Sequence, residues 1–134
     1  MNNKRNLLIG FVISLLMLAS LACEASASTA TISSATLTSD SAGATATTSY
    51  APDATFYCAV ALANAPDTTK VKAVWYAVDD AGTATKFAEK EIVGSGTPII
   101  FNASNTAGPW PVGKYRVEVY LNDKLDKTLD FAVQ

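Results

Sequence analysis

Apolar and polar residues alternate with a period of two along most of the chain, which is typical of strands with one buried face. The segment 70–78 places Val71 and Trp75 on one face and Tyr76 on the other. In 114–121, Tyr115 and its alternate neighbours point inward, while Tyr120 points outward. Similar but weaker alternation extends the pattern, which predicts strands over 31–38, 55–63, 70–78, 85–93, 97–101, 114–121 and 125–133.

Turn residues separate these segments, and no connection is long enough to hold a crossover helix. Asn122-Asp123 is a two-residue hairpin connection of a type that tolerates positive φ. The segment 40–49 is small and polar and is expected to be a loop, with at most a weak edge strand. About seven strands in about 105 residues predict an all-β fold, a seven-stranded antiparallel β-sandwich.

The first residues do not fit this pattern and have the features of an export signal. Lys4 and Arg5 precede an apolar run from Leu7 to Ala22, and Cys23 follows directly. The run is shorter than the roughly 20 residues of a spanning helix. We therefore expect a signal peptide over 1–22, a tether with a lipidated cysteine over 23–29, and the sandwich over 30–134. An alternative is ordinary cleavage after Ala27, or an uncleaved anchor.

The Ala22-Cys23 junction resembles the lipobox of bacterial lipoproteins, although Ser20 stands where that motif prefers leucine. The sandwich resembles the immunoglobulin-like fold, with Cys58 on the second strand, Trp75 on the third and Tyr115 opening the sixth. The segments 64–76 and 109–121 are similar to bacterial surface lipoproteins with a single immunoglobulin-like domain. This resemblance implies a corner hydrogen bond at Tyr115 and a place in the cell envelope, but no defined activity.

Composition excludes several kinds of chemistry. The 134 residues include 10 basic and 12 acidic residues and no histidine. Without Lys4 and Arg5 the balance is close to −4, and the basic residues are not clustered, so no nucleic-acid partner is expected. The missing histidine removes the commonest general base and a common metal ligand. We expect no catalytic residues, no metal, no cofactor and no enzymatic activity.

The two cysteines and the turn carboxylates have simple structural interpretations. Cys58 alternates with core residues and is expected to be buried and inert, although a disulfide with Cys23 is the alternative if Cys23 is not acylated. The turns at 79–80 and 122–123 lack the further carboxylates that a calcium site needs.

Three aromatic side chains are candidates for binding. Trp110 lies between Pro109 and Pro111, so it is either a rigid exposed platform or a cap on the core. Tyr76 and Tyr120 share the outward face of neighbouring strands, where aromatic residues favour a protein contact or simply stabilise the sheet.

These features together favour a non-enzymatic, membrane-anchored or secreted monomer of the cell envelope that binds or spaces a protein or glycan outside the membrane. A carbohydrate-binding or adhesin module that uses the Trp110 loop is the first alternative. An envelope enzyme inhibitor or accessory subunit is the second.

Overall fold

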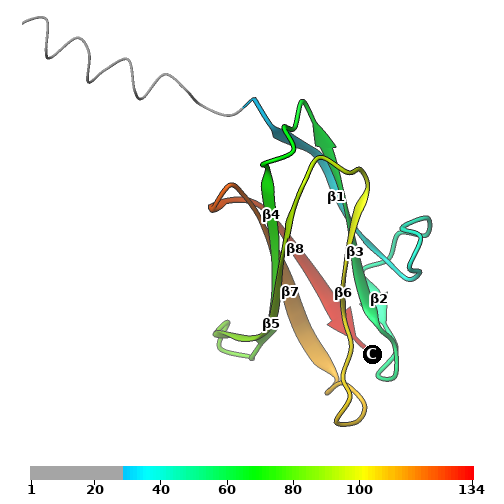
Figure 1. Cartoon of the computed structure of the whole chain (residues 1–134). Coiled ribbons are helices and arrows are strands. Elements are labelled where there is room, and N and C mark those ends of the chain that lie inside the picture. The colour runs from blue at the N-terminus through cyan, green and yellow to red at the C-terminus, as the bar shows by residue number, and fades with distance from the viewer. Residues whose placement is uncertain (1–28) are drawn as a thin grey trace, which may run out of the picture.

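The computed structural model describes residues 29–134, and these form two sheets packed face to face (Figure 1). The eight strands are β1 (Thr31–Thr38), β2 (Ser49–Tyr50), β3 (Phe56–Ala63), β4 (Lys70–Val78), β5 (Ala84–Val93), β6 (Ile99–Ala103), β7 (Gly113–Leu121) and β8 (Lys124–Val133). One sheet has three strands in the order β1-β3-β6, and the other has five in the order β2-β8-β7-β4-β5.

The expected seven-stranded, fully antiparallel sandwich is therefore wrong in strand number and direction. The additional strand is β2, which lies in the segment expected to be a loop. It pairs with β8 in parallel, with Ser49 opposite Ala132 and Tyr50 opposite Val133. Its sequence gives no alternation to detect, because the strand has only two residues. Tyr50 fixes its position, since the ring is buried and the hydroxyl donates to the carbonyl oxygen of Thr38 at 2.7 Å.

The remaining strands lie where alternation placed them, within two residues at each end. Their inward residues form one hydrophobic cluster between the sheets, in which Phe56, Val60 and Trp75 are almost fully buried. Asn122 and Asp123 have φ values of 48° and 69°, as the hairpin connection required.

A β-bulge places Leu125 on the outer surface of the five-stranded sheet. Opposite Val119 lies Lys127, whereas opposite Tyr120 lies Leu125, so the β7–β8 register shifts between them. Leu125 therefore lies beside Tyr120 on the outer face of the sheet and is 53% exposed.

The corner hydrogen bond at Tyr115 is present. Its hydroxyl donates to the carbonyl oxygen of Pro111 at 2.6 Å, and the residue is buried. We expect Tyr115→Phe to lower the free energy of unfolding by about 1 kcal/mol, because the ring stays and only this bond is lost. Urea denaturation measures the change. Tyr120→Phe is the control, since its hydroxyl bonds at the surface, and an equal loss in both variants would contradict the assignment.

Candidate functional site

Trp110 is not the exposed platform that its loop suggested. Only 8% of the residue is exposed, and its ring stacks on Phe56 with centroids 4.5 Å apart. Its indole Nε1–H donates to the carbonyl oxygen of Ala54 at 2.8 Å. The two neighbouring prolines hold the indole over the end of the core, so Trp110 caps the core. The expectation of a binding module that uses an exposed Trp110 loop is therefore wrong.

Tyr76 and Tyr120 do lie on one surface, the outer face of the five-stranded sheet. In the pairing of β4 with β7, Lys72 is opposite Tyr120 and Val74 is opposite Glu118. Tyr76 follows on the same face, opposite Arg116. We call this surface the tyrosine face and define it by Lys72, Val74, Tyr76, Arg116, Glu118, Tyr120 and Leu125.

Val74 shows that the tyrosine face is tightly packed. This side chain is only 4% exposed, yet it is not part of the cluster between the sheets. Because the eight strands form only two layers, no other element of residues 29–134 covers this face. The neighbouring side chains of the face itself must therefore shield Val74 from water.

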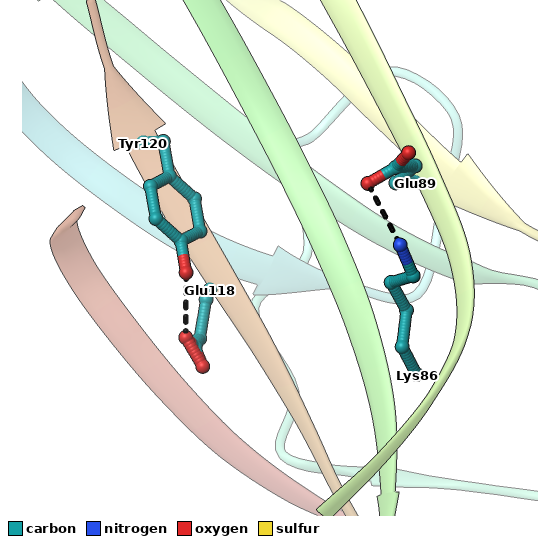
Figure 2. Close-up of polar contacts among 4 residues, drawn as sticks. All are labelled: Lys86, Glu89, Glu118 and Tyr120. Carbon is teal, nitrogen blue, oxygen red and sulfur yellow. Dashed lines mark hydrogen bonds and ion pairs between the residues drawn. The ribbon is translucent and has the colours of Figure 1, made fainter. Parts of the chain in front are cut away.

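Tyr120 is held by polar contacts on both sides. Its hydroxyl donates to Oε2 of Glu118 at 3.1 Å, as Figure 2 shows, and Nζ of Lys72 lies 4.9 Å from the centre of its ring. Desolvation, followed by the hydrogen bond and charge of Glu118 and then by Tyr76, raises the pKa of Tyr120 to about 12. The phenol therefore stays protonated at neutral pH and remains a hydrogen-bond donor.

Two exposed ion pairs lie on or beside the tyrosine face. Arg116 Nε lies 3.0 Å from Oδ1 of Asp130 on β8, and Lys86 Nζ lies 3.3 Å from Oε2 of Glu89 on β5 (Figure 2). Such exposed pairs contribute only about 0–1 kcal/mol each to stability. They place charges of both signs beside Tyr76, since Arg116 and Lys86 lie opposite it on β7 and β5.

One aromatic residue near the core was missed by sequence reasoning. Phe87 is 37% exposed and lies against Trp110, with ring centroids 5.1 Å apart. It sits at a bulge in β5, where the register passes from Ala88 to Lys86 and leaves Phe87 unpaired with β4. A phenylalanine among charged residues on an edge strand is the signal that could have indicated it.

Two open grooves lie away from the tyrosine face. One, of about 480 Å³, runs between β1 and β8 and is lined by Ala35, Thr36, Leu37, Ala46, Thr47, Thr48, Thr128, Leu129 and Asp130. The other, of about 370 Å³, is lined by Ala77, Phe87, Ser104, Asn105, Thr106, Trp110, Pro111 and Tyr115. The first lining contains threonine hydroxyls and one carboxylate, that of Asp130, which is paired with Arg116 Nε at 3.0 Å.

The Cys58 thiol is buried in the core, and carboxylates of the two turns make contacts within the fold. Cys58 is fully buried, and burial raises the pKa of its thiol to about 12, so the reactive thiolate is not formed at neutral pH. Asp79 Oδ1 accepts the backbone N–H of Thr83 at 2.8 Å, and Oδ2 of Asp123 lies 3.7 Å from Nζ of Lys70. Within residues 29–134, no three His, Cys, Asp or Glu side chains gather as metal ligands would.

The export signal, its cleavage site and Cys23 lie outside the described residues, so acylation of Cys23 stays a prediction from the sequence. In residues 29–134 there is no helix with the length and apolarity needed to cross a bilayer.

Comparison with known proteins gives a fold relationship and no family. No family model matches the chain, and no curated protein matches it. Among solved structures, it is similar to the Pseudomonas fluorescens alkylpurine DNA glycosylase AlkC bound to DNA containing an abasic site analog. The TM-score is 0.50 at 15% sequence identity, over 78% of this chain and 30% of that chain. This chain thus spans less than a third of that protein, and the likeness concerns the fold.

This similarity contradicts two expectations. A non-enzymatic envelope module, with its glycan-binding and inhibitor alternatives, was inferred from a resemblance to surface lipoproteins, whereas the similar structure is a DNA glycosylase. Nucleic acid was excluded on charge, whereas that structure contains DNA. Overall charge and a resemblance over two short segments were therefore too coarse to decide partner or function.

Proposed function

We propose that residues 29–134 form a recognition domain that binds a folded protein through the tyrosine face. The observation that carries this proposal is the packing around Val74. A buried valine outside the core, beneath neighbours that include two half-buried tyrosines, means that the side chains of this open sheet face are already packed against one another.

The side chains of the face suit a protein contact. Tyrosine and arginine are enriched where proteins bind one another, because each offers a large contact area together with hydrogen-bond donors. Tyr120 is already oriented by Glu118 and Lys72, so little rotamer entropy would be lost on binding. Leu125 adds an exposed apolar side chain at the border.

The proposal predicts that the two tyrosines contribute much of the affinity. We expect Tyr76→Ala and Tyr120→Ala each to weaken partner binding about 10- to 100-fold, as removal of a central interface aromatic does. A partner retained from an extract of the source cells is identified by mass spectrometry, purified, and titrated against each variant by calorimetry.

Tyr57→Ala is the matched control, since Tyr57 is a half-buried tyrosine on the outer face of the three-stranded sheet. It should leave the affinity unchanged. Equal losses in Tyr57→Ala and Tyr120→Ala would contradict the tyrosine face as the binding surface.

A second candidate ligand is nucleic acid, at the same face. The similar glycosylase was solved bound to DNA. In this chain Lys72 and Arg116 lie beside the tyrosines, and bases stack on aromatic rings while cations contact phosphates. Salt-dependent binding of a labelled oligonucleotide, lost in Tyr120→Ala, would favour this candidate over a protein.

A further inference from the structure

The connection between β1 and β2 crosses the outer face of the three-stranded sheet. Gly43 marks the closest approach: its φ is +72°, and a Cβ atom there would lie 2.9 Å from Cβ of Ala59 and 3.0 Å from Cδ1 of Ile100. A space of about 200 Å³ remains between the connection and the sheet, lined by Ser34, Thr36, Gly43, Ala44, Ala46, Ala59, Ala61 and Pro98. We call the segment 40–46 the lid.

The surface beneath the lid differs from the rest of the molecule because it has no charge. The sequences of β1, β3 and β6 contain no Asp, Glu, Lys or Arg. All the charged strand residues belong to the five-stranded sheet. Opening the lid would therefore expose more of an uncharged face of small and apolar side chains.

A single carboxylate ties the lid together. Oδ1 of Asp40 accepts the backbone N–H of Ala42 and of Ala44, each at 3.0 Å, and Oδ2 accepts that of Thr45 at 2.7 Å. Two backbone hydrogen bonds add to these contacts. The N–H of Gly43 donates to the carbonyl oxygen of Asp40 at 3.2 Å, and the N–H of Ser39 donates to the carbonyl oxygen of Thr45 at 2.9 Å. Both carboxylate oxygens are thus used as acceptors, which only the ionised form supports fully.

We propose that the Asp40 carboxylate, through its bonds within the lid, holds the backbone in the conformation that brings Gly43 onto Ala59 of β3 and Ile100 of β6, and that protonation of this carboxylate releases the lid. The titratable groups on the adjoining strands are Tyr50, Tyr57 and Cys58. None of these gains a proton in acid. On β8, Asp130 lines a groove together with Ala46 of the lid and is ion-paired with Arg116, whereas Asp40 is the carboxylate that accepts the backbone N–H groups of the lid itself.

The direction of the pH effect follows from the same bonds. The backbone N–H groups of Ala44 and Thr45, in that order, hold the pKa of Asp40 below its ordinary value of 3.8. A lowered pKa means that the closed lid is favoured above the ordinary value, and that this preference is lost as the pH falls through the lowered one. Release is therefore expected only in acid, below about pH 4.

The test is NMR on the purified protein at about pH 6 and in acid, at a pH where the chemical shift of the Asp40 carboxyl carbon shows that this group is protonated. Closure is read from the nuclear Overhauser effect between Gly43 Hα and the Ile100 δ1 methyl, and from exchange protection of the Ala44 and Thr45 amides. In the wild type we expect the Overhauser effect near pH 6 and its loss in acid, with protection falling at least about 10-fold while core amides of β3 stay protected.

Asp40→Asn should lack the Overhauser effect at both pH values, because an amide offers one acceptor oxygen instead of two. Asp80→Asn, which removes an exposed carboxylate from the β4–β5 turn, should behave as the wild type. A lid that stays closed in Asp40→Asn near pH 6 would overturn the proposal. The proposal would also be overturned if the wild-type lid opened only when the β3 amides lost their protection as well. This outcome is measured on the wild type, so it does not require that the variant folds.

Discussion

Phe56→Ala should lower the free energy of unfolding by about 3–5 kcal/mol, among the largest losses available to a single substitution in this domain. Phe56 is fully buried at the start of β3 and lies at the centre of the aromatic core. Its ring contacts those of Tyr50, Trp75, Trp110, Tyr115 and Phe131, with centroids 4.9, 6.1, 4.5, 5.5 and 4.8 Å away. Truncation removes all five contacts and leaves a cavity that rigid sheets cannot close.

Such a loss would be a large part of the roughly 5–15 kcal/mol that stabilises a domain of this size. The measurement is urea denaturation with an unchanged slope, which ensures that the two-state description holds. Phe87→Ala is the control, because the same side chain at the bulge of β5 is 37% exposed and should cost much less. Equal losses would mean that the aromatic core is not organised around Phe56.

Trp75→Ala is expected to cost about 3–5 kcal/mol as well, for a different reason. Trp75 is 1% exposed on β4, which lies between β7 and β5 in the five-stranded sheet. Within residues 29–134 its Nε1–H is buried with no hydrogen-bond acceptor. The indole therefore contributes packing and carries the cost of an unpaired donor.

This combination predicts an order among substitutions. Trp75→Phe loses volume but also removes the unpaired N–H, so it should cost distinctly less than Trp75→Ala. Thermal and urea denaturation of both variants measure the order. If Trp75→Phe were as destabilising as Trp75→Ala, an acceptor for the indole N–H would have to exist in solution.

Strand positions were predictable because alternation is local. Trp75 and Tyr76 are neighbours on one strand, so once Trp75 points into the core, Tyr76 must point away from it. The same reasoning placed Tyr115 inside and Tyr120 outside. The two tyrosines of the candidate site were therefore assigned to one face before any pairing was known.

Features that depend on pairing between distant segments were not predictable. Tyr50 and Val133 are far apart in sequence, and neither signals that β2 will join β8 in parallel. The bulges that expose Leu125 and turn Phe87 toward Trp110 are shifts in register, which a single strand's composition does not encode. The contact of Lys72 with Tyr120 likewise depends on the β4–β7 register.

The tyrosine face as a binding surface is tested most directly by hydroxyl-radical footprinting of the protein with and without its captured partner. Oxidation of each tyrosine is followed by mass spectrometry. The proposal predicts that Tyr76 and Tyr120 become protected in the complex, while Tyr57 on the opposite outer face is oxidised at an unchanged rate. Protection of Tyr57 with no change at Tyr76 and Tyr120 would contradict it.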